Sequence, residues 1–331
     1  MIIPQYWAEA RLQHGERRRK ITLRRFGWSD IGEAEAQAHA DARVREALQR
    51  VLAGEALPRR ERRVAYNGAE GVPIREEIVD RPGDAVITRN GYGALCLNTP
   101  NVLFADIDHA VYVVRVQLPL WRMLAGLAIA IMILLVSDVA PAKYMVAALA
   151  GIAGGFLLGG TVARLAQWFY IQLTGGFERS ARRRVATFVA RHPDWLVRVY
   201  RTPAGLRLLA LHRLFDPREP EVKACFDALG VDPMYARMCF NQNCFRARIS
   251  PKPWRMGMPR LHPPYSAVWR PEHADLPARR QWVETYEREA RGYASCRYVE
   301  TLGNGALDPA AETVLQLHDT FCSAEQDLKL A

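Results

Sequence analysis

The stretch Asn101-Val-Leu-Phe-Ala-Asp-Ile-Asp108 (NVLFADID) decides the fold. Its apolar run predicts a buried strand, and two acids follow at spacing i, i+2. Because alternate side chains of a strand point to the same side, Asp106 and Asp108 should project together near the end of the strand. A long apolar segment begins ten residues later, at Leu118. The paired acids therefore lie close in sequence to a predicted membrane segment.

That apolar segment predicts a membrane hairpin over residues 113–172. Leu118–Val136 and Tyr144–Ala163 are each long enough to cross a hydrocarbon layer of about 30 Å, and only a short polar turn separates them. Small residues recur at intervals of four in the second span, at Gly151, Gly155 and Gly159, and such a face lets another helix approach closely. The first span is the expected partner, and a homo-oligomer formed through the same face is left open.

Charge placement predicts the orientation of the hairpin. The chain has 331 residues and a formal net charge of +10, and arginines cluster after the second span while the turn holds a single Lys143. By the positive-inside rule both termini should be cytoplasmic, with two spans in the inner membrane. The basic excess also favours nucleotides, nucleic acid or an anionic leaflet as partners. The N-terminus has no apolar core of signal-peptide length, so the six cysteines are expected to be reduced.

The flanks of the hairpin predict a mixed α+β domain with a mainly antiparallel sheet. Residues 1–112 and 173–331 should complete one cytoplasmic domain, because neither flank alone contains an obvious full sheet. Expected strands are 20–26, 62–66, 74–79, 85–89, 94–97, 102–108, 195–202, 205–212, 245–249 and 293–302. Expected helices are one capped by Ser29 or Asp30 that runs to about residue 53, then 178–191, 220–229, 234–240, 276–291 and one that begins near residue 309.

The acid pair is the first chemical candidate. Two converging carboxylates suit Mg²⁺ or Mn²⁺, and such an ion can bridge phosphate oxygens and polarise a phosphoryl or nucleotidyl group. We therefore predict Asp106 and Asp108 as metal ligands and catalytic residues. The alternative is a purely structural role, in which the acids only mark the point where the strand reaches solvent.

Two basic segments are candidates for phosphate binding. The strand–turn–strand pattern around Thr202, Gly205 and Arg207 could present backbone N–H groups and a guanidinium to a phosphate. Arg246 and Arg248 share one strand face, and Lys252 follows shortly after them. The alternative for this second segment is a solvated basic face beside anionic lipid.

The cysteines give a weaker signal. Cys239 and Cys244 flank a four-residue segment, and a zinc site there would need two further ligands, from Cys225, Cys296 or His262. Whether Cys239 and Cys244 bind zinc is left open. No Walker-type GxxxxGK[ST], HExxH or GxSxG motif is present.

Two resemblances add to these inferences. The stretches RRFGWSD, YNGAEGVPIREEIV, ITRNGYGALCLNTPNVLFADID, YRTPAGLRLLALH and CFRARISPKPWR resemble a group of uncharacterised bacterial transmembrane proteins. The order of three motifs is also distantly similar to archaeo-eukaryotic primase-polymerases: an apolar strand ending in Asp-x-Asp, then a Ser/Thr-containing strand, then an Arg-rich segment running into Lys. This second resemblance implies metal-dependent handling of nucleotides on an RRM-like core. Arg207 stands where that family has a histidine, and the hairpin separates the first two motifs.

Three functions of different classes follow. The first is a membrane-anchored protein with a divalent-metal and nucleotide or phosphate site, which as an enzyme would carry out phosphoryl or nucleotidyl transfer. The second is a non-enzymatic membrane module that binds anionic lipid or a protein partner. The third is an Asp-x-Asp glycosyltransferase, which would need a largely parallel, doubly wound sheet.

Overall fold

The protein was analysed as a computed structural model. The structure describes residues 1–15, 20–61, 72–108, 118–136, 142–173, 175–261 and 269–331. The strand expected at 62–66, the start of the expected hairpin at 113–117 and the candidate ligand His262 lie outside these residues.

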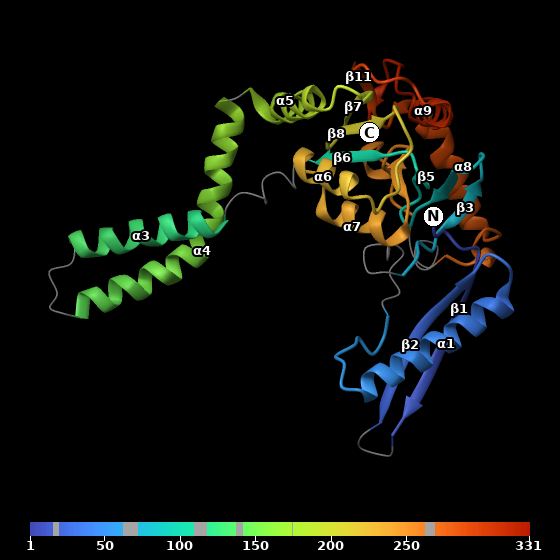
Figure 1. Ribbon diagram of the computed structural model, residues 1–331, viewed down its shortest axis with the longest axis horizontal. Coiled ribbons are helices and arrows are strands. Elements are labelled where there is room, and N and C mark those ends of the chain that lie inside the picture. Colours follow the sequence, from blue (N-terminus) through green and yellow to red (C-terminus); the bar gives the residue numbers. More distant parts are fainter. Residues whose placement is uncertain (16–19, 62–71, 109–117, 137–141, 174, 262–268) are drawn as a thin grey trace.

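The N-terminal lobe is a two-stranded ribbon covered by one helix (Figure 1). Strands β1 (Tyr6–His14) and β2 (Ile21–Ser29) pair antiparallel, and α1 (Glu33–Leu52) packs on them. Alanines and one valine on a single face of α1 form a small separate core with Leu23, because apolar residues recur there at helical spacing. The sequence predicted β2 and α1 but missed β1. The predicted cap was wrong: α1 begins after Gly32, with no side-chain cap.

Two four-stranded antiparallel sheets form the main body. The first has the order β3-β4-β5-β9 and the second the order β11-β7-β8-β6. The strands of the first are β3 (Glu77–Asp80), β4 (Val86–Arg89), β5 (Leu95–Thr99) and β9 (Phe245–Arg248). Those of the second are β6 (Phe104–Asp108), β7 (Val197–Thr202), β8 (Gly205–Ala210) and β11 (Arg297–Leu302). Each sheet joins strands from both sides of the hairpin, and the α+β class with antiparallel sheets is confirmed.

Helices cover these sheets and enclose one large core. They are α5 (Gly176–Arg191), α6 (Pro220–Leu229), α7 (Pro233–Gln242), α8 (Pro277–Ala290) and α9 (Pro309–Cys322), with short 3₁₀ turns η3 (Pro253–Arg255) and η4 (Pro271–His273). A small parallel pair, β10 (Tyr293–Ala294) and β12 (Lys329–Leu330), lies near the C-terminus. Proline in the first turn of α6, α7 and α9 suits a helix start, where its missing N–H would have no partner. The fully buried side chains Trp195, Phe104 and Phe245 belong to this core.

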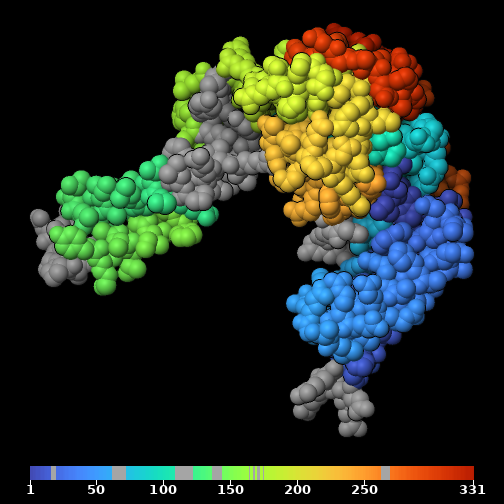
Figure 2. Space-filling model, in the orientation of Figure 1, coloured from blue at the N-terminus to red at the C-terminus, as the bar shows by residue number. Residues whose placement is uncertain are grey.

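The hairpin consists of α3 (Leu118–Val136) and α4 (Ala142–Leu173), which pack against each other. In Figures 1 and 2 the two helices project from the main body of the molecule. The small-residue stripe of α4 faces α3: a Cβ at Gly155 would lie 2.5 Å from the Arg122 carbonyl oxygen, and one at Gly126 would lie 2.6 Å from that of Gly151. Glycine at these positions therefore permits the close helix contact. A homo-oligomer through the Gly151, Gly155 and Gly159 face stays a prediction.

The outer surface of the hairpin is strongly apolar. Leucine, isoleucine and phenylalanine side chains of both helices are exposed, among them Leu135, Ile152 and Leu157. Within the described residues one helix, Tyr144–Ala163, is long and apolar enough to cross a membrane, whereas the apolar part of α3, Arg122–Leu135, is shorter. The length and composition of one helix are weak evidence of membrane association.

Candidate metal and phosphate site

Asp106 is held by an arginine on the neighbouring strand. In the antiparallel register of β6 and β8, Asp106 lies opposite Arg207 and Asp108 lies opposite Gly205. Directly opposed residues share one face of a sheet, so the two side chains meet. Arg207 donates from Nε to Asp106 Oδ1 at 2.8 Å and from Nη2 to Oδ2 at 3.2 Å. These two parallel hydrogen bonds, which we call the fork, fix the carboxylate and leave its remaining lone pairs for another cation.

Arg207 also joins the two sheets. Its Nη1 donates to the backbone carbonyl of Arg248 on β9 at 2.8 Å and lies 3.3 Å from His318 Nε2. The side chain is almost fully buried. Burial is the largest single influence and disfavours its charge, but the attraction and hydrogen bonds of Asp106, together with Cys296 and Cys322, raise the pKa of Arg207 overall. Arg207 is therefore an ionised residue that positions Asp106, and most of its N–H donors already have acceptors within the protein.

Asp108 lies next to Asp106 and within the electrostatic reach of further cations. Burial, followed by repulsion from Asp106, raises the pKa of Asp108, whereas Lys252 opposes this rise. The pKa of Lys252 is lowered by burial and by its neighbours Arg248 and Arg255. The acid pair and these basic residues thus act on one another as one group of charges.

This group, which we call the acid–base cluster, consists of Asp106, Asp108, Arg207, Arg248, Lys252 and Arg255. Four cations and two carboxylates leave it with a net positive charge. The Nη1 atom of Arg255 is buried and has no hydrogen-bond acceptor among the described residues. A buried donor without an acceptor is costly, which makes this nitrogen a candidate ligand contact.

An aromatic side chain borders the cluster. Trp254, in η3, is 49% exposed and lies 5.1 Å from the Tyr92 ring, centroid to centroid. The Lys252 ammonium lies 5.5 Å from the centroid of the Trp254 ring. An exposed indole beside a group of basic side chains is the kind of surface on which an aromatic ring can stack.

The turn residues predicted for phosphate binding have other contacts. Thr202 Oγ1 accepts a hydrogen bond from the Ala204 N–H at 3.3 Å, within the β7–β8 turn. Gly205 is paired with Asp108, and a Cβ there would overlap the Ile107 carbonyl oxygen. Gly205 therefore permits the close approach of β8 to β6, and a direct phosphate role for Thr202 or Gly205 stays a prediction.

Arg246 does not belong to the acid–base cluster and pairs with a different carboxylate. Its Nη2 donates to Glu76 at 2.7 Å and its Nη1 to Asn98 at 3.0 Å, and a weaker contact reaches Thr88. The side chains of Arg246 and Glu76 are 6% and 2% exposed. The structure thus places Arg246 in a buried ion pair, because Glu76 compensates its charge, and not beside Asp106 and Asp108.

A cysteine–histidine group lies on the other side of Arg207. Cys296, His318 and Cys322 are fully buried, and one ligand atom from each lies within 4.8 Å of the others. A zinc site was considered at Cys239 and Cys244, with Cys296 as one possible further ligand, and among the described residues no metal-ligand trio includes Cys239 or Cys244. The spacing of His318 and Cys322, one helical turn apart, is the signal that could have pointed to this group.

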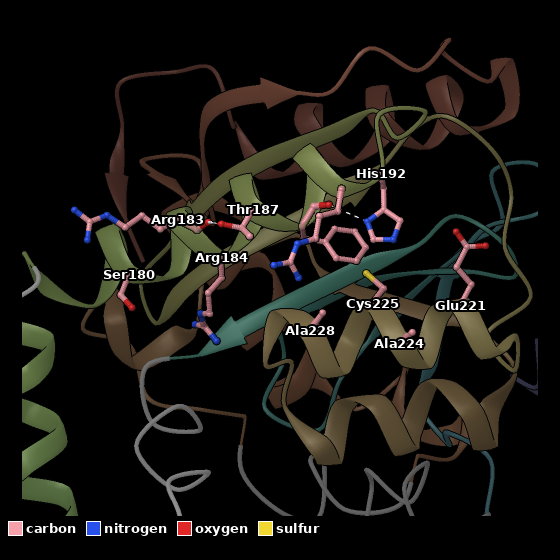
Figure 3. Close-up of a pocket in the computed structure, with 11 residues that line it drawn as sticks. Ser180, Arg183, Arg184, Thr187, His192, Glu221, Ala224, Cys225 and Ala228 are labelled. Atoms are coloured by element: carbon pink, nitrogen blue, oxygen red, sulfur yellow. Dashed lines mark hydrogen bonds between the residues drawn. The ribbon is translucent and has the colours of Figure 1, made fainter.

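A basic pocket of about 500 Å³ lies between α5 and α6 (Figure 3). It is lined by Ser180, Arg183, Arg184, Thr187, Phe188, Arg191, His192, Glu221, Ala224, Cys225 and Ala228. Arg183 and Arg191 are exposed, and among the described residues no ion pair involves either of them. The helix α5 begins just after α4 ends, so the pocket lies close in sequence to the hairpin.

Comparisons with known proteins returned nothing that assigns a family. No family model, no curated protein and no solved structure matches the chain. The functional argument therefore depends on the geometry of the cluster.

Replacing Asp108 by asparagine should stabilise the fold at neutral pH in buffer without divalent cations. The pKa of Asp108 is raised above its ordinary value of 3.8, so the folded state holds this proton more tightly than the unfolded chain. Its contribution to stability is largest in acid and is lost as the pH rises from about 3.8 through the raised pKa. Since the carboxyl is partly exposed, the gain from Asp108→Asn should not exceed about 1 kcal/mol.

Thermal unfolding measured from pH 4 to pH 8 checks this, with roughly one-unit steps across the window in which a raised carboxyl titrates. Asp80→Asn is the matched control, because Asp80 is exposed on β3 and its Oδ1 accepts a hydrogen bond from the adjacent Arg81 N–H. Equal stability of wild type and Asp108→Asn throughout the range would contradict the prediction.

Proposed function

We propose that the chain binds a nucleotide or a related phosphorylated ligand together with Mg²⁺ or Mn²⁺ at the acid–base cluster. The observation that supports this most directly is the fork from Arg207, which holds Asp106 beside Asp108, while Lys252 acts on both carboxylates and Arg255 acts on Asp108. Carboxylates for a hard cation and basic groups for phosphate oxygens are thus gathered in one place.

The charge balance of the cluster predicts an order of binding. Because the cluster is net positive, a free divalent cation is repelled by the basic residues as well as attracted by the two acids. A polyphosphate would neutralise Lys252, Arg248 and Arg255, and Asp106 and Asp108 would then hold the cation that accompanies it. Metal and nucleotide should therefore bind cooperatively. A phosphoryl or nucleotidyl transfer on such a complex would depend on positioning and charge neutralisation.

A thermal-shift screen in detergent tests the proposal. The nucleoside triphosphates ATP, GTP, CTP and UTP are each added to the full chain with and without Mg²⁺. At a ligand concentration of about 100 Kd the stabilisation should approach 2.7 kcal/mol, seen as a rise in Tm that requires Mg²⁺. Asp106→Asn should abolish the Mg²⁺-dependent part of the rise in Tm, and Asp80→Asn should retain it. A shift that is the same in Asp106→Asn and wild type would refute the assignment.

We also propose that both helices of the hairpin enter the inner membrane and that both termini are cytoplasmic. The exposed apolar side chains on α3 and α4 support insertion of the pair, because so large an apolar surface is unfavourable in water. The arginines of α5 support the orientation. Protease added to sealed right-side-out vesicles should leave both flanks intact, and their digestion would contradict this topology.

The basic pocket favours a second function, the binding of an anionic lipid headgroup. Arg183 and Arg191 present exposed guanidinium groups in a pocket on the helix that follows the hairpin. A guanidinium binds phosphate oxygens well, and basic pockets beside membrane helices are common headgroup sites. Such a role would make the protein a membrane module with or without a nucleotide.

Phosphatidylglycerol, added in detergent, should raise the Tm more than phosphatidylcholine. The double variant Arg183→Gln/Arg191→Gln should lose most of that difference. Arg291→Gln, at an exposed position after α8, should keep it. An undiminished preference for phosphatidylglycerol in the double variant would exclude the pocket as the headgroup site.

The glycosyltransferase alternative does not fit the fold. Both four-stranded sheets are antiparallel, whereas that function was expected on a doubly wound parallel sheet.

A further inference from the structure

The Cys296–His318–Cys322 group is assembled by two segments near the C-terminus. His318 and Cys322 lie one turn apart on α9 and share one face of that helix. Cys296 lies in the short segment before β11, and the neighbouring Ser295 N–H donates to the Cys322 carbonyl at 3.0 Å. This backbone hydrogen bond brings the segment to the end of the helix, so all three side chains meet inside the core.

The histidine is oriented by a second carboxylate. His318 Nδ1 lies 2.9 Å from Asp319 Oδ1, and Asp319 is itself held by Arg198 at 2.8 Å. When His318 donates its Nδ1–H to Asp319, its Nε2 carries no proton. Cys296 Sγ lies 3.8 Å from this Nε2. Histidines that bind metals commonly donate their second nitrogen to a carboxylate in this manner, which fixes the ring and the tautomer.

Burial distinguishes among the roles that such a group could play. A cysteine nucleophile must reach a substrate, but Cys296, His318 and Cys322 have no exposed surface. A buried site built from two thiols and an imidazole suits a Zn²⁺ ion, since soft sulfur and borderline nitrogen ligands select zinc over Mg²⁺. The group is therefore chemically distinct from the paired acids.

We propose that Cys296, His318 and Cys322 bind one Zn²⁺ ion. Two thiolates neutralise the charge of the ion, and a water molecule completes the four-coordinate shell. Arg207 Nη1 now lies 3.3 Å from His318 Nε2, so the ion replaces that contact, while Arg207 keeps its bonds to Asp106 and Arg248. The metal ligands and the metal differ from those of the nucleotide proposal, so either proposal can fail alone, although Arg207 contacts both Asp106 and His318.

The full chain, purified in detergent with ZnCl₂ and without chelators, should contain about one zinc atom per chain by elemental analysis, as expected for a single site. Cys322→Ser and His318→Ala should each lose most of this zinc. Cys239→Ser is the matched control, since Cys239 is also fully buried and belongs to no ligand trio among the described residues, and it should keep the metal.

Cobalt replacement of the wild-type protein gives a second readout that needs no variant. Co²⁺ bound to two thiolates should produce thiolate-to-cobalt charge-transfer absorption together with the visible bands of a tetrahedral site. The proposal is overturned if the wild type holds neither zinc nor cobalt, or if Cys322→Ser folds and retains stoichiometric zinc. Detection of a Cys296–Cys322 disulfide in place of bound metal would overturn it equally.

Discussion

Arg246→Met should lower the free energy of unfolding by about 3–5 kcal/mol, the cost of leaving a buried charge without its partner. Arg246 and Glu76 form an ion pair of 2.7 Å with side chains that are 6% and 2% exposed. Thr88 Oγ1 also donates to Glu76 Oε2, and Arg246 Nη1 donates to Asn98, whereas Glu76 Oε1 is buried without a hydrogen-bond partner among the described residues. Removal of the guanidinium leaves the Glu76 carboxylate in a low-dielectric interior, where its charge has little other compensation.

Chemical denaturation followed by tryptophan fluorescence in detergent measures this loss. The double variant Glu76→Gln/Arg246→Met should recover part of the stability, because no unpaired charge then remains. Arg201→Gln is the control: Arg201 forms an exposed pair with Glu178, and its loss should cost no more than about 1 kcal/mol. A loss below about 1 kcal/mol for Arg246→Met would show that the buried pair is not formed as described.

Arg207→Met should have the second largest effect, a loss of about 2–4 kcal/mol together with weaker Mg²⁺-dependent nucleotide binding. The Arg248 carbonyl loses its hydrogen bond, and Asp106 loses both contacts of the fork. The cost should be smaller than for Arg246, since the Asp106 side chain is 28% exposed and water can solvate part of its charge. Binding should weaken because the freed carboxylate no longer has a fixed orientation beside Asp108.

Arg207→Lys separates charge from geometry. Lysine keeps a positive charge near Asp106 but cannot form the two-pronged contact and still reach the Arg248 carbonyl. We expect an intermediate stability and a nucleotide affinity closer to that of Arg207→Met. Unchanged nucleotide affinity in both variants, measured by thermal shift at several ligand concentrations, would contradict a positioning role for Arg207.

Local patterns in the sequence predicted most of the elements of the main body. Helix α6 was expected at its observed bounds, 220–229, because a proline, an apolar stripe and the final Gly230 mark its ends. Strands β4 to β9 follow alternation and turn residues in the same way. The ribbon strand β1 was missed although Ala8, Ala10 and Leu12 alternate with polar residues, because alanine, glutamate, arginine, leucine and glutamine favour a helix, and pairing with β2 decides for a strand. The predicted pair of membrane spans is supported by one helix of sufficient length.

The candidate site was predictable only in part. Strand periodicity predicted that Asp106 and Asp108 share a side, but not that Arg207 would pair with one of them from the opposing strand. Periodicity likewise put Arg246 and Arg248 on one face, although it could not reveal that Glu76, 170 positions away in sequence, would neutralise Arg246. The i, i+4 spacing of His318 and Cys322 was visible in the sequence, but the approach of Cys296 depends on the tertiary contact of the segment before β11 with the end of α9.

Direct titration of Mn²⁺ tests the central claim, that Asp106 and Asp108 hold a divalent cation beside a bound polyphosphate. Free Mn²⁺ is measured by electron paramagnetic resonance, with ATP pre-bound to the full chain in detergent and with corrections from ATP alone. The wild type and Asp80→Asn should remove about one Mn²⁺ per chain from the free pool, as a single site requires. Asp106→Asn and Asp108→Asn should bind at least tenfold more weakly, a difference of about 1.4 kcal/mol. Equal Mn²⁺ binding by all four proteins would contradict the account.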